Sequence, residues 1–334
     1  MRLIIILFLS LVVGKFSQLF SQCSHTGKKL STEFLSPGFS DLEKKYDVNY
    51  YHINLLINNL DTYIEGYTDI GITALEVIDT IVFELLDDLS IDSINVNSEY
   101  HQNYLHSDGL INIAIDNNIQ VGEKTMLRIY YKGASQSSNF FSGISNRSDF
   151  IYNKSVTYTL SEPFQASSWF PVKQDLHDKA DSVRVYLTVD EDLMAGSNGV
   201  LENISIPEDG KKTYEWFSNY PIAYYLISFS VSDYIDYSFN VSIEGVDDSL
   251  LVQNFIYNSV NIFENEKENI DKTGDLLELF SSLFGTYPFI NEKYGHCMAP
   301  MGGGMEHQTM TTLQNFNFLL VAHELAHQWF GDYV

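Results

Sequence analysis

The stretch His323-Glu-Leu-Ala-His-Gln-Trp-Phe-Gly-Asp332 carries the strongest structural signal in the sequence. If these residues form a helix, His323 and His327 are one turn apart and project from the same face. Two imidazoles in that arrangement can bind one metal ion, and Glu324 lies beside them, where a carboxylate can take a proton from a metal-bound water. The spacing therefore predicts a helix that holds a zinc site, with His323 and His327 as ligands and Glu324 as general base.

The residues around this motif favour a metal site over a packed helix that only happens to contain histidines. The apolar residues Phe318 to Ala322, together with Leu325 and Ala326, make the segment apolar nearly all round, which predicts a buried helix. Histidines and a glutamate in a buried helix need partners or a metal ion. Gly331 is the stop that we expect just past the end of the helix.

The motif supplies two of the ligands that a catalytic zinc ion needs. Such an ion normally has three protein ligands and a water. The chain continues only to Val334. We therefore expect one zinc ion whose third protein ligand lies beyond residue 334, and we expect the chain to be part of a longer enzyme.

The first 22 residues have the features of an export signal. Arg2 supplies the positive charge, the run from Leu3 to Val13 is interrupted only by Ser10, and a polar stretch follows. The run is shorter than the roughly 20 residues that span a bilayer. We expect a signal peptide at 1–22, a linker at 23–41, and a protein that is secreted, periplasmic or on the cell surface, with no membrane span after signal removal.

Charge and cysteine content exclude several classes of protein. The formal net charge of −25 argues against nucleic acid or an anionic membrane as a partner. The two cysteines, Cys23 and Cys297, exclude a disulfide framework and a cysteine-based zinc site.

The pattern of apolar residues divides the chain into two parts. Alternation with period two, as in Tyr51, Ile53, Leu55 and Ile57, recurs up to about residue 234 and predicts a large antiparallel β domain. After about residue 250 helical spacing appears, with an expected helix end at Gly285. The β domain should also contain a loop at Ser135–Ser148 and further strands at Ile64–Ile72, Thr80–Leu86, Met126–Tyr131, Val183–Val189 and Tyr224–Val231.

A second motif, Gly303-Gly-Met-Glu-His307, precedes the metal helix. Consecutive glycines let a backbone approach a ligand closely, or form a sheet edge against which a peptide can lie. Glu306 could then meet a cationic group of the substrate. If this segment stood alone, a flexible turn with a solvated acid would be the better interpretation.

Together the two motifs resemble those of the aminopeptidase N family of zinc metallopeptidases, the gluzincin aminopeptidases. That family has Gly-x-Met-Glu-Asn followed downstream by His-Glu-x-x-His. Thr159-Leu-Ser-Glu162 and then Phe170-Pro171 are similar to the family's Thr-Gln-x-Glu…Phe-Pro stretch. The resemblance runs from about residue 42 to the C-terminus. It implies an all-β domain with a large saddle-like sheet at 42–245, followed at 246–334 by the incomplete start of an α/β thermolysin-like catalytic domain.

The resemblance also implies roles for individual residues. His323 and His327 would bind zinc, and Glu324 would assist attack of a zinc-bound water. Glu306 and Glu162 would bind the substrate's α-ammonium group, while Gly303, Gly304 and Met305 would line its backbone. The implied function is a zinc-dependent aminopeptidase that hydrolyses N-terminal residues from peptides with a free N-terminus. His307 stands where the family has Asn, and Leu160 where it has Gln, so the amine pocket departs from the pattern.

Two other interpretations fit the same sequence. Within the zinc peptidases, a thermolysin-like endopeptidase would share the His-Glu-x-x-His helix. Outside them, the chain would be a catalytically dead, truncated product whose β domain binds peptides or protein partners. An N-acetylated substrate distinguishes the first from an aminopeptidase, and zinc content distinguishes the second.

Overall fold

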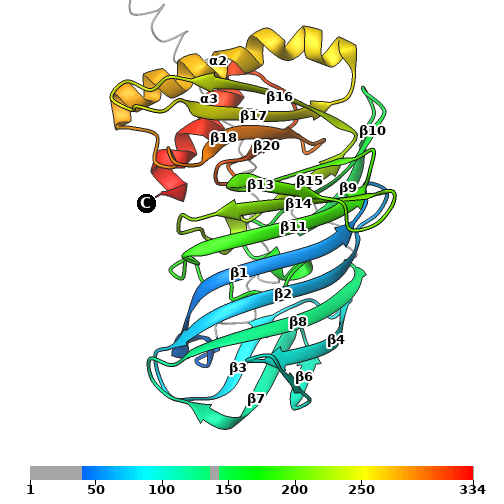
Figure 1. Cartoon of the computed structure of the whole chain (residues 1–334), viewed down its shortest axis with the longest axis vertical. Coiled ribbons are helices and arrows are strands. Elements are labelled where there is room, and N and C mark those ends of the chain that lie inside the picture. The colour runs from blue at the N-terminus through cyan, green and yellow to red at the C-terminus, as the bar shows by residue number, and fades with distance from the viewer. Residues whose placement is uncertain (1–39, 136–142, 334) are drawn as a thin grey trace, which may run out of the picture.

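The computed structural model describes residues 40–135 and 143–333. The expected signal peptide, nearly all of the linker and Cys23 lie outside these residues. The described part is elongated, with a large β region at one end and a mixed α/β region at the other (Figure 1). Within the described residues, no helix is long and apolar enough to cross a membrane.

An eight-stranded sheet forms the main body of the β region, as the period-two pattern predicts. Its order is β13-β14-β11-β1-β2-β8-β4-β5, and every neighbouring pair is antiparallel except β1 and β11, which are parallel. The strands are β1 (Tyr46–Ile57), β2 (Tyr63–Ala74), β4 (Leu89–Val96), β5 (Glu99–His101), β8 (Lys124–Ala134), β11 (Ser182–Asp190), β13 (Val200–Ser205) and β14 (Lys211–Ser218).

The alternation along β1 shows why this sheet has one buried face. Tyr51, Ile53 and Leu55 are buried and alternate with more exposed polar residues. The register with β2 shifts between Val48 and Tyr50, and at this bulge the buried positions change from even to odd numbers. The apolar side chains therefore stay on the core face along the whole strand.

Two smaller sheets complete the β region. One has the order β3-β7-β6 and the other β12-β15-β10-β9. Their strands are β3 (Ile78–Glu84), β6 (Tyr104–Ser107), β7 (Leu110–Ile119), β9 (Gly143–Asp149), β10 (Lys154–Leu160), β12 (Met194–Ser197) and β15 (Phe229–Ser232).

Two local predictions in this region were wrong. The expected loop at Ser135–Ser148 contains most of β9. Gly143 to Asp149 are mostly polar, but they form a strand because their backbone pairs with β10. The expected strand at Tyr224–Val231 begins instead as a 3₁₀ turn, Tyr224–Leu226. There the Asn198 amide donates to the Leu226 carbonyl and accepts from the Ser228 N–H, at 2.9 and 2.7 Å. These bonds engage backbone groups that a strand would offer to its neighbours.

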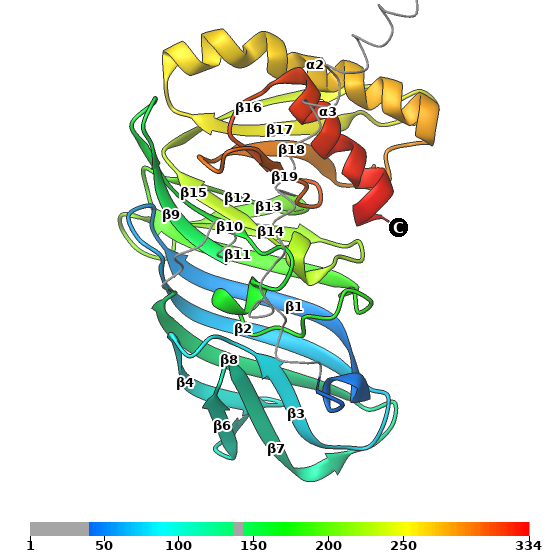
Figure 2. The same ribbon diagram turned by 180° about the vertical axis from the view of Figure 1, so that it is seen from behind.

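The second region is a five-stranded sheet with two helices against it. The order is β16-β17-β18-β20-β19, so β19 is an edge strand. Its elements are β16 (Tyr234–Val241), β17 (Leu250–Tyr257), α2 (Val260–Phe284), β18 (Lys293–Met298), β19 (Gly304–Met305), β20 (Thr311–Leu313) and α3 (Phe318–His327). Helix α2 connects the parallel strands β17 and β18, and it contacts α3 and the sheet (Figures 1 and 2).

Two boundaries in this region were predicted from the sequence, the end of helix α2 and the division between domains. Helix α2 ends at the expected Gly285, whose φ of 98° suits a residue without a side chain. The expected domain division at residue 245 falls in the turn between β16 and β17, which pair with each other in the same sheet. That division stays a prediction.

A buried lysine lies at the junction of the two regions. Lys293, at the start of β18, is fully buried, and its Nζ donates to the Ser197 carbonyl of β12 at 3.2 Å and to the Thr309 carbonyl at 3.1 Å. The same Nζ lies 5.1 Å from the centroid of the Trp216 ring. Burial disfavours the ammonium form and lowers the pKa of Lys293 to about 7.

Replacing Lys293 by methionine should remove part of the pH dependence of stability. The pKa of the lysine is about 7 when folded and ordinarily 10.5. Between these values the unfolded chain holds a proton that the folded protein lacks. This residue's contribution to the free energy of unfolding therefore rises with pH, by up to about 1.4 kcal/mol per unit.

Urea unfolding at pH 7 and pH 9 measures this effect. The native protein should gain stability relative to Lys293→Met as the pH rises. Lys124→Met, a change at an exposed lysine, should keep the native dependence. Parallel pH profiles for the native protein and Lys293→Met would contradict the assignment.

Candidate metal centre

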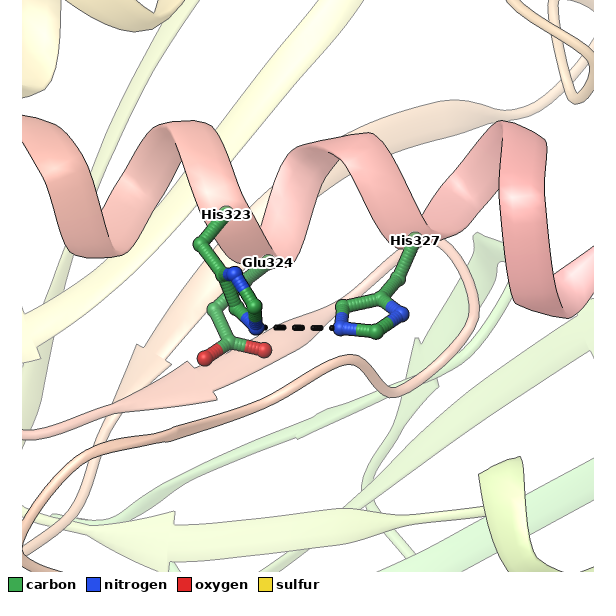
Figure 3. Close-up of side chains that lie close together, drawn as sticks. All are labelled: His323, Glu324 and His327. Atoms are coloured by element: carbon green, nitrogen blue, oxygen red, sulfur yellow. Dashed lines mark hydrogen bonds between the residues drawn. The ribbon is translucent and has the colours of Figure 1, made fainter. Parts of the chain in front are cut away.

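Helix α3 brings the three residues of the His-Glu-x-x-His motif together. Asn317 caps the helix, since its Oδ1 accepts from the backbone N–H groups of Leu319 and Leu320 at 3.0 and 3.4 Å. His323 and His327 lie on one face, and their Nε2 atoms are 3.1 Å apart (Figure 3). One possible ligand atom from each of His323, Glu324 and His327 lies within 4.8 Å of the others.

The two imidazoles fit a zinc ion. Two nitrogens bound tetrahedrally at the usual zinc–nitrogen distance lie about 3.3 Å apart, close to the spacing of the two Nε2 atoms. Burial lowers the pKa of both histidines. At His323 the charge of His327 adds to this effect, and Glu306 opposes it, whereas at His327 it is Glu162 that opposes it. Neutral imidazole is the form that binds a metal ion.

The carboxylate of Glu324 is buried without a full set of partners. The residue is 1% exposed, and its Oε2 has no hydrogen-bond partner among the described residues. Burial, together with the negative charges of Glu306 and Glu162, raises the pKa of Glu324 to about 8. A nearby cation would stabilise this carboxylate, so the environment of Glu324 also fits a metal ion beside it.

The edge strand β19 lies directly against the Glu324 carboxylate. A Cβ atom built on Gly304 would be 2.5 Å from Glu324 Oε1 and 2.7 Å from its Cδ. Gly304 therefore has to be a glycine if strand and carboxylate keep their positions. Among the residues that the structure describes, β19 pairs with β20 alone, so its other edge can accept an extended peptide.

The other expected substrate-binding residues lie around this centre. Glu306 directly follows β19, and Glu162 follows β10 in the β region. Both are partly exposed, and both influence the charge state of Glu324. Met305 is buried in β19, next to Gly304. The structure thus brings both motifs and Glu162 into one neighbourhood, and the roles of these residues stay predictions.

Two details of the metal helix differ from expectation. Gly331 does not end the helix, because Gln328–Asp332 continue it as a π-helix that contains Gly331. The helix is not buried all round, since Phe318, Leu319 and His323 are exposed. Within the described residues α3 is packed on one side, against α2 and β19.

His307, which replaces the family's Asn, is fully buried and bonded through Nδ1 to Thr312 at 2.9 Å.

Sequence reasoning missed Gln328, which links the metal helix to the segment after β19. Its Nε2 donates to the Glu306 carbonyl at 3.2 Å and to Asp332 Oδ2 at 2.7 Å, and its Oε1 accepts from the Thr309 N–H at 2.8 Å. A glutamine directly after the second histidine carries no chemical signal of this role. Only the position of the segment 306–309 shows it.

Tyr225 and Asp332 were also missed. The half-buried Tyr225 belongs to the 3₁₀ turn of the β region, and its pKa is raised by burial and by the charges of Glu306, Asp332 and Glu162. Asp332 is fully buried, and burial raises the pKa of its carboxyl well above the usual range. Its backbone carbonyl accepts from Lys179 Nζ at 2.8 Å, so the β region also contacts the end of the metal helix.

Comparison with known proteins identifies the β region and the overall fold. Residues 47–226 match the peptidase M1 N-terminal domain family. The chain is similar in structure to an M1 zinc metallopeptidase from Deinococcus radiodurans, with a TM-score of 0.74 and 22% identity over 86% of the chain. A glutamate-to-alanine variant of the D. radiodurans enzyme, bound to a Tyr-Ser-Ala substrate, matches at 21% identity over 86% of the chain with a TM-score of 0.75.

A third solved structure is also similar. It is a two-domain M1 zinc metallopeptidase variant bound to L-arginine, with a TM-score of 0.76 and 21% identity over 87% of the chain. The chain spans 65% to 66% of the length of these three structures. At this level of identity the likeness shows the fold.

Replacing Gln328 by alanine should destabilise the protein by about 2–4 kcal/mol. The change leaves the buried Asp332 carboxyl and the Thr309 N–H without their partner, and buried polar groups that lose a partner carry the full desolvation penalty. Urea unfolding measures the difference. Gln120→Ala, at an exposed glutamine in a turn, is the matched control and should change stability by less than about 0.5 kcal/mol. Equal stability of the two variants would contradict the linking role of Gln328.

Proposed function

The chain belongs to the peptidase M1 family, and from this premise we propose that it forms part of a zinc-dependent aminopeptidase that removes residues one at a time from peptide N-termini. The observation that carries the proposal is the combination around the open edge of β19. Two imidazoles converge on one face of α3, the buried Glu324 carboxylate lies against the strand, and the charges of two further carboxylates act on Glu324.

Each residue of the centre has a distinct part in this proposal. His323 and His327 would hold the zinc ion, which when bound would polarise the scissile carbonyl and lower the pKa of a water. Glu324 would accept the proton of the attacking water and pass it to the leaving amine, a contribution of about 10²–10⁴ in rate. Its carboxylate lies against Gly304 of β19, beside the strand edge where the reacting group would lie.

Glu306 and Glu162 would make the enzyme an exopeptidase. Their carboxylates would bind the α-ammonium group that only the first residue of a peptide carries. An internal segment lacks that cation and would leave both acids unpaired, a penalty of roughly 2–5 kcal/mol. The proximity of both acids to Glu324 supports this assignment, since their charges raise its pKa.

Two further parts of the proposal concern a third zinc ligand and the N-terminal segment. A catalytic zinc ion has three protein ligands and α3 would supply two, so the proposed centre needs one more ligand outside α3. The apolar run Leu3–Val13 supports export from the cytoplasm, to the cell surface or beyond.

Changing Glu324 to glutamine should abolish turnover while zinc stays bound. Glutamine keeps the shape of the side chain but cannot accept the proton, so we expect kcat for leucine p-nitroanilide to fall by about 10²–10⁴. The assay uses the zinc-loaded protein expressed from the complete coding sequence, with zinc content measured by atomic absorption. Glu278→Gln, at an exposed glutamate of α2, is the control. Undiminished turnover by Glu324→Gln would rule out its role as base.

Acetylating the substrate's N-terminus should abolish hydrolysis. The acetyl group removes the cation that Glu306 and Glu162 would bind, so matched free and acetylated peptides separate an aminopeptidase from an endopeptidase. Glu306→Gln and Glu162→Gln should each raise KM for the free peptide by at least about tenfold, with Glu244→Gln as an exposed control. Equal cleavage of both peptides would favour an endopeptidase.

A further inference from the structure

Glu162 and Glu306, the two acids that the proposed function assigns to the substrate's ammonium group, come from different regions of the fold. Glu162 follows β10 of the β region, whereas Glu306 follows β19 of the five-stranded sheet. A hydrogen bond from an ammonium group to a carboxylate is about 2.7–2.9 Å long. One ammonium group can therefore bond to both acids only if their carboxylates lie at a fixed separation. The bonds that join the two regions near these acids bear directly on substrate binding.

The 3₁₀ turn of the β region is bonded to the segment that carries Glu162. Its first residue is the buried Tyr224, whose hydroxyl donates to the carbonyl of Pro163 at 2.5 Å. Pro163 directly follows Glu162. On the other side of Glu162, the Oγ of the buried Ser161 accepts from Trp169 Nε1 at 3.0 Å. The chain at Glu162 is thus held on both sides, and one of these contacts comes from the turn.

Asn198 joins this turn to the segment after Glu306. It is buried and lies between β12 and β13, where the β region meets the five-stranded sheet (Figure 2). Its Nδ2 donates to the carbonyl of Leu226, the last residue of the turn, at 2.9 Å and to the Gln308 carbonyl at 2.7 Å. Its Oδ1 accepts from the Ser228 N–H at 2.7 Å. Both N–H groups of the amide are therefore used to connect the turn with a residue two positions after Glu306.

The residues beside Asn198 hold the next residue of the same segment. The Gly199 N–H donates to Thr309 Oγ1 at 2.8 Å. Lys293 Nζ donates to the carbonyls of both Ser197 and Thr309. Thr309 has a φ of 63°, a left-handed conformation that is uncommon for a β-branched residue and persists where the surroundings hold it. The chain around Asn198 therefore keeps this segment in one position.

The middle residue of the turn is close to both acids. Burial raises the pKa of the half-buried Tyr225, and the charges of three carboxylates, Glu306 and Glu162 among them, contribute to the shift. Salt screens exposed charges beyond roughly 10 Å, so a carboxylate that acts on Tyr225 lies near the turn. This agrees with the bonds of the turn to the segments of both acids.

We propose that Asn198 is a positioning residue for the amine site: by joining the turn to the segment after Glu306, it holds Glu306 and Glu162 at the separation that one ammonium group requires. The proposal rests on the proposed function. Asn198 is buried, so it would act only through the two carbonyl groups to which it donates. Without these bonds the segment after Glu306 would shift relative to the turn, and the affinity of the site for an ammonium group would fall.

Inhibition of leucine p-nitroanilide hydrolysis by two small molecules tests the proposal in the zinc-loaded protein expressed from the complete coding sequence. Isopentylamine carries an ammonium group and the side chain of leucine, whereas acetohydroxamate binds zinc and has no ammonium group. In Asn198→Ala the inhibition constant of isopentylamine should rise by about tenfold, since one carboxylate would no longer reach the ammonium group. The inhibition constant of acetohydroxamate should change by less than about twofold.

These two constants separate positioning from a loss of folded protein. An inhibition constant does not depend on the fraction of the protein that is active, so partial unfolding alone would leave both constants at their native values. The milder variant Asn198→Ser keeps a polar group, but its shorter side chain cannot join both carbonyl groups, so its constant for isopentylamine should also rise. Asn146→Ala is the matched control and should keep both native constants, because Asn146 Nδ2 also joins two segments, by donating to the Asn59 carbonyl at 2.8 Å, but within the β region.

Native inhibition constants for isopentylamine in both Asn198 variants would overturn the positioning role. An equal rise in the constants of both inhibitors would also overturn it, because the change would then affect the metal centre and not the separation of the two acids. If isopentylamine does not inhibit the native protein, or if the native protein does not hydrolyse the anilide, the proposed function itself fails, and the positioning role with it.

Discussion

The close contact between Gly304 and the Glu324 carboxylate is the constraint on which the candidate site depends. A peptide can reach the carboxylate from the open edge of β19 only if the strand itself lies close to helix α3. A side chain at position 304 would occupy the space that the carboxylate fills. The glycine therefore sets the distance between the surface that would hold the substrate backbone and the group that would move the proton. The two sequence motifs meet at this one contact.

The electrostatics of the site follow from the concentration of acids around that contact. Glu324 is buried, and Glu306 and Glu162 add negative charge, so its pKa is raised to about 8. Such a cluster is unfavourable by itself and becomes favourable when cations are present. A metal ion at the histidines and an ammonium group at the outer acids would supply those cations. The positive charges of the zinc ion and of the substrate's ammonium group would then offset the negative charges of the three glutamates.

Much of the fold could be predicted because it depends on simple periodicities. Alternation along β1 indicates a half-buried strand, and the spacing of Ile270 to Phe284 indicates the helix that ends at Gly285. His323, Glu324 and His327 could be placed together because helical geometry fixes their faces. The resemblance to a known family added Glu162, which is far away in the sequence and which no local pattern connects to the metal helix.

The two errors in the β region share a physical cause, since each involves contacts with a segment elsewhere in the sequence. Asn198 holds the 3₁₀ turn at Tyr224–Leu226, and β10 draws Gly143 to Asp149 into a strand. The helix extends through Gly331, where Gln328 and Asp332 bond to each other. Gln328 also joins α3 to the segment after β19 by bonding to backbone groups of Glu306 and Thr309. Every residue type has such groups, so the sequence does not indicate these bonds.

The turnover and zinc content of a Gly304→Ala protein test the central claim most directly. The added Cβ would displace the Glu324 carboxylate or the strand, and would leave His323 and His327 in place. We expect kcat for leucine p-nitroanilide to fall by at least about 100-fold, with zinc content unchanged. Gly331→Ala, whose Cβ would meet nothing closer than 3.5 Å, should retain activity. Full activity of Gly304→Ala would contradict the claim that strand, carboxylate and metal ligands form one site.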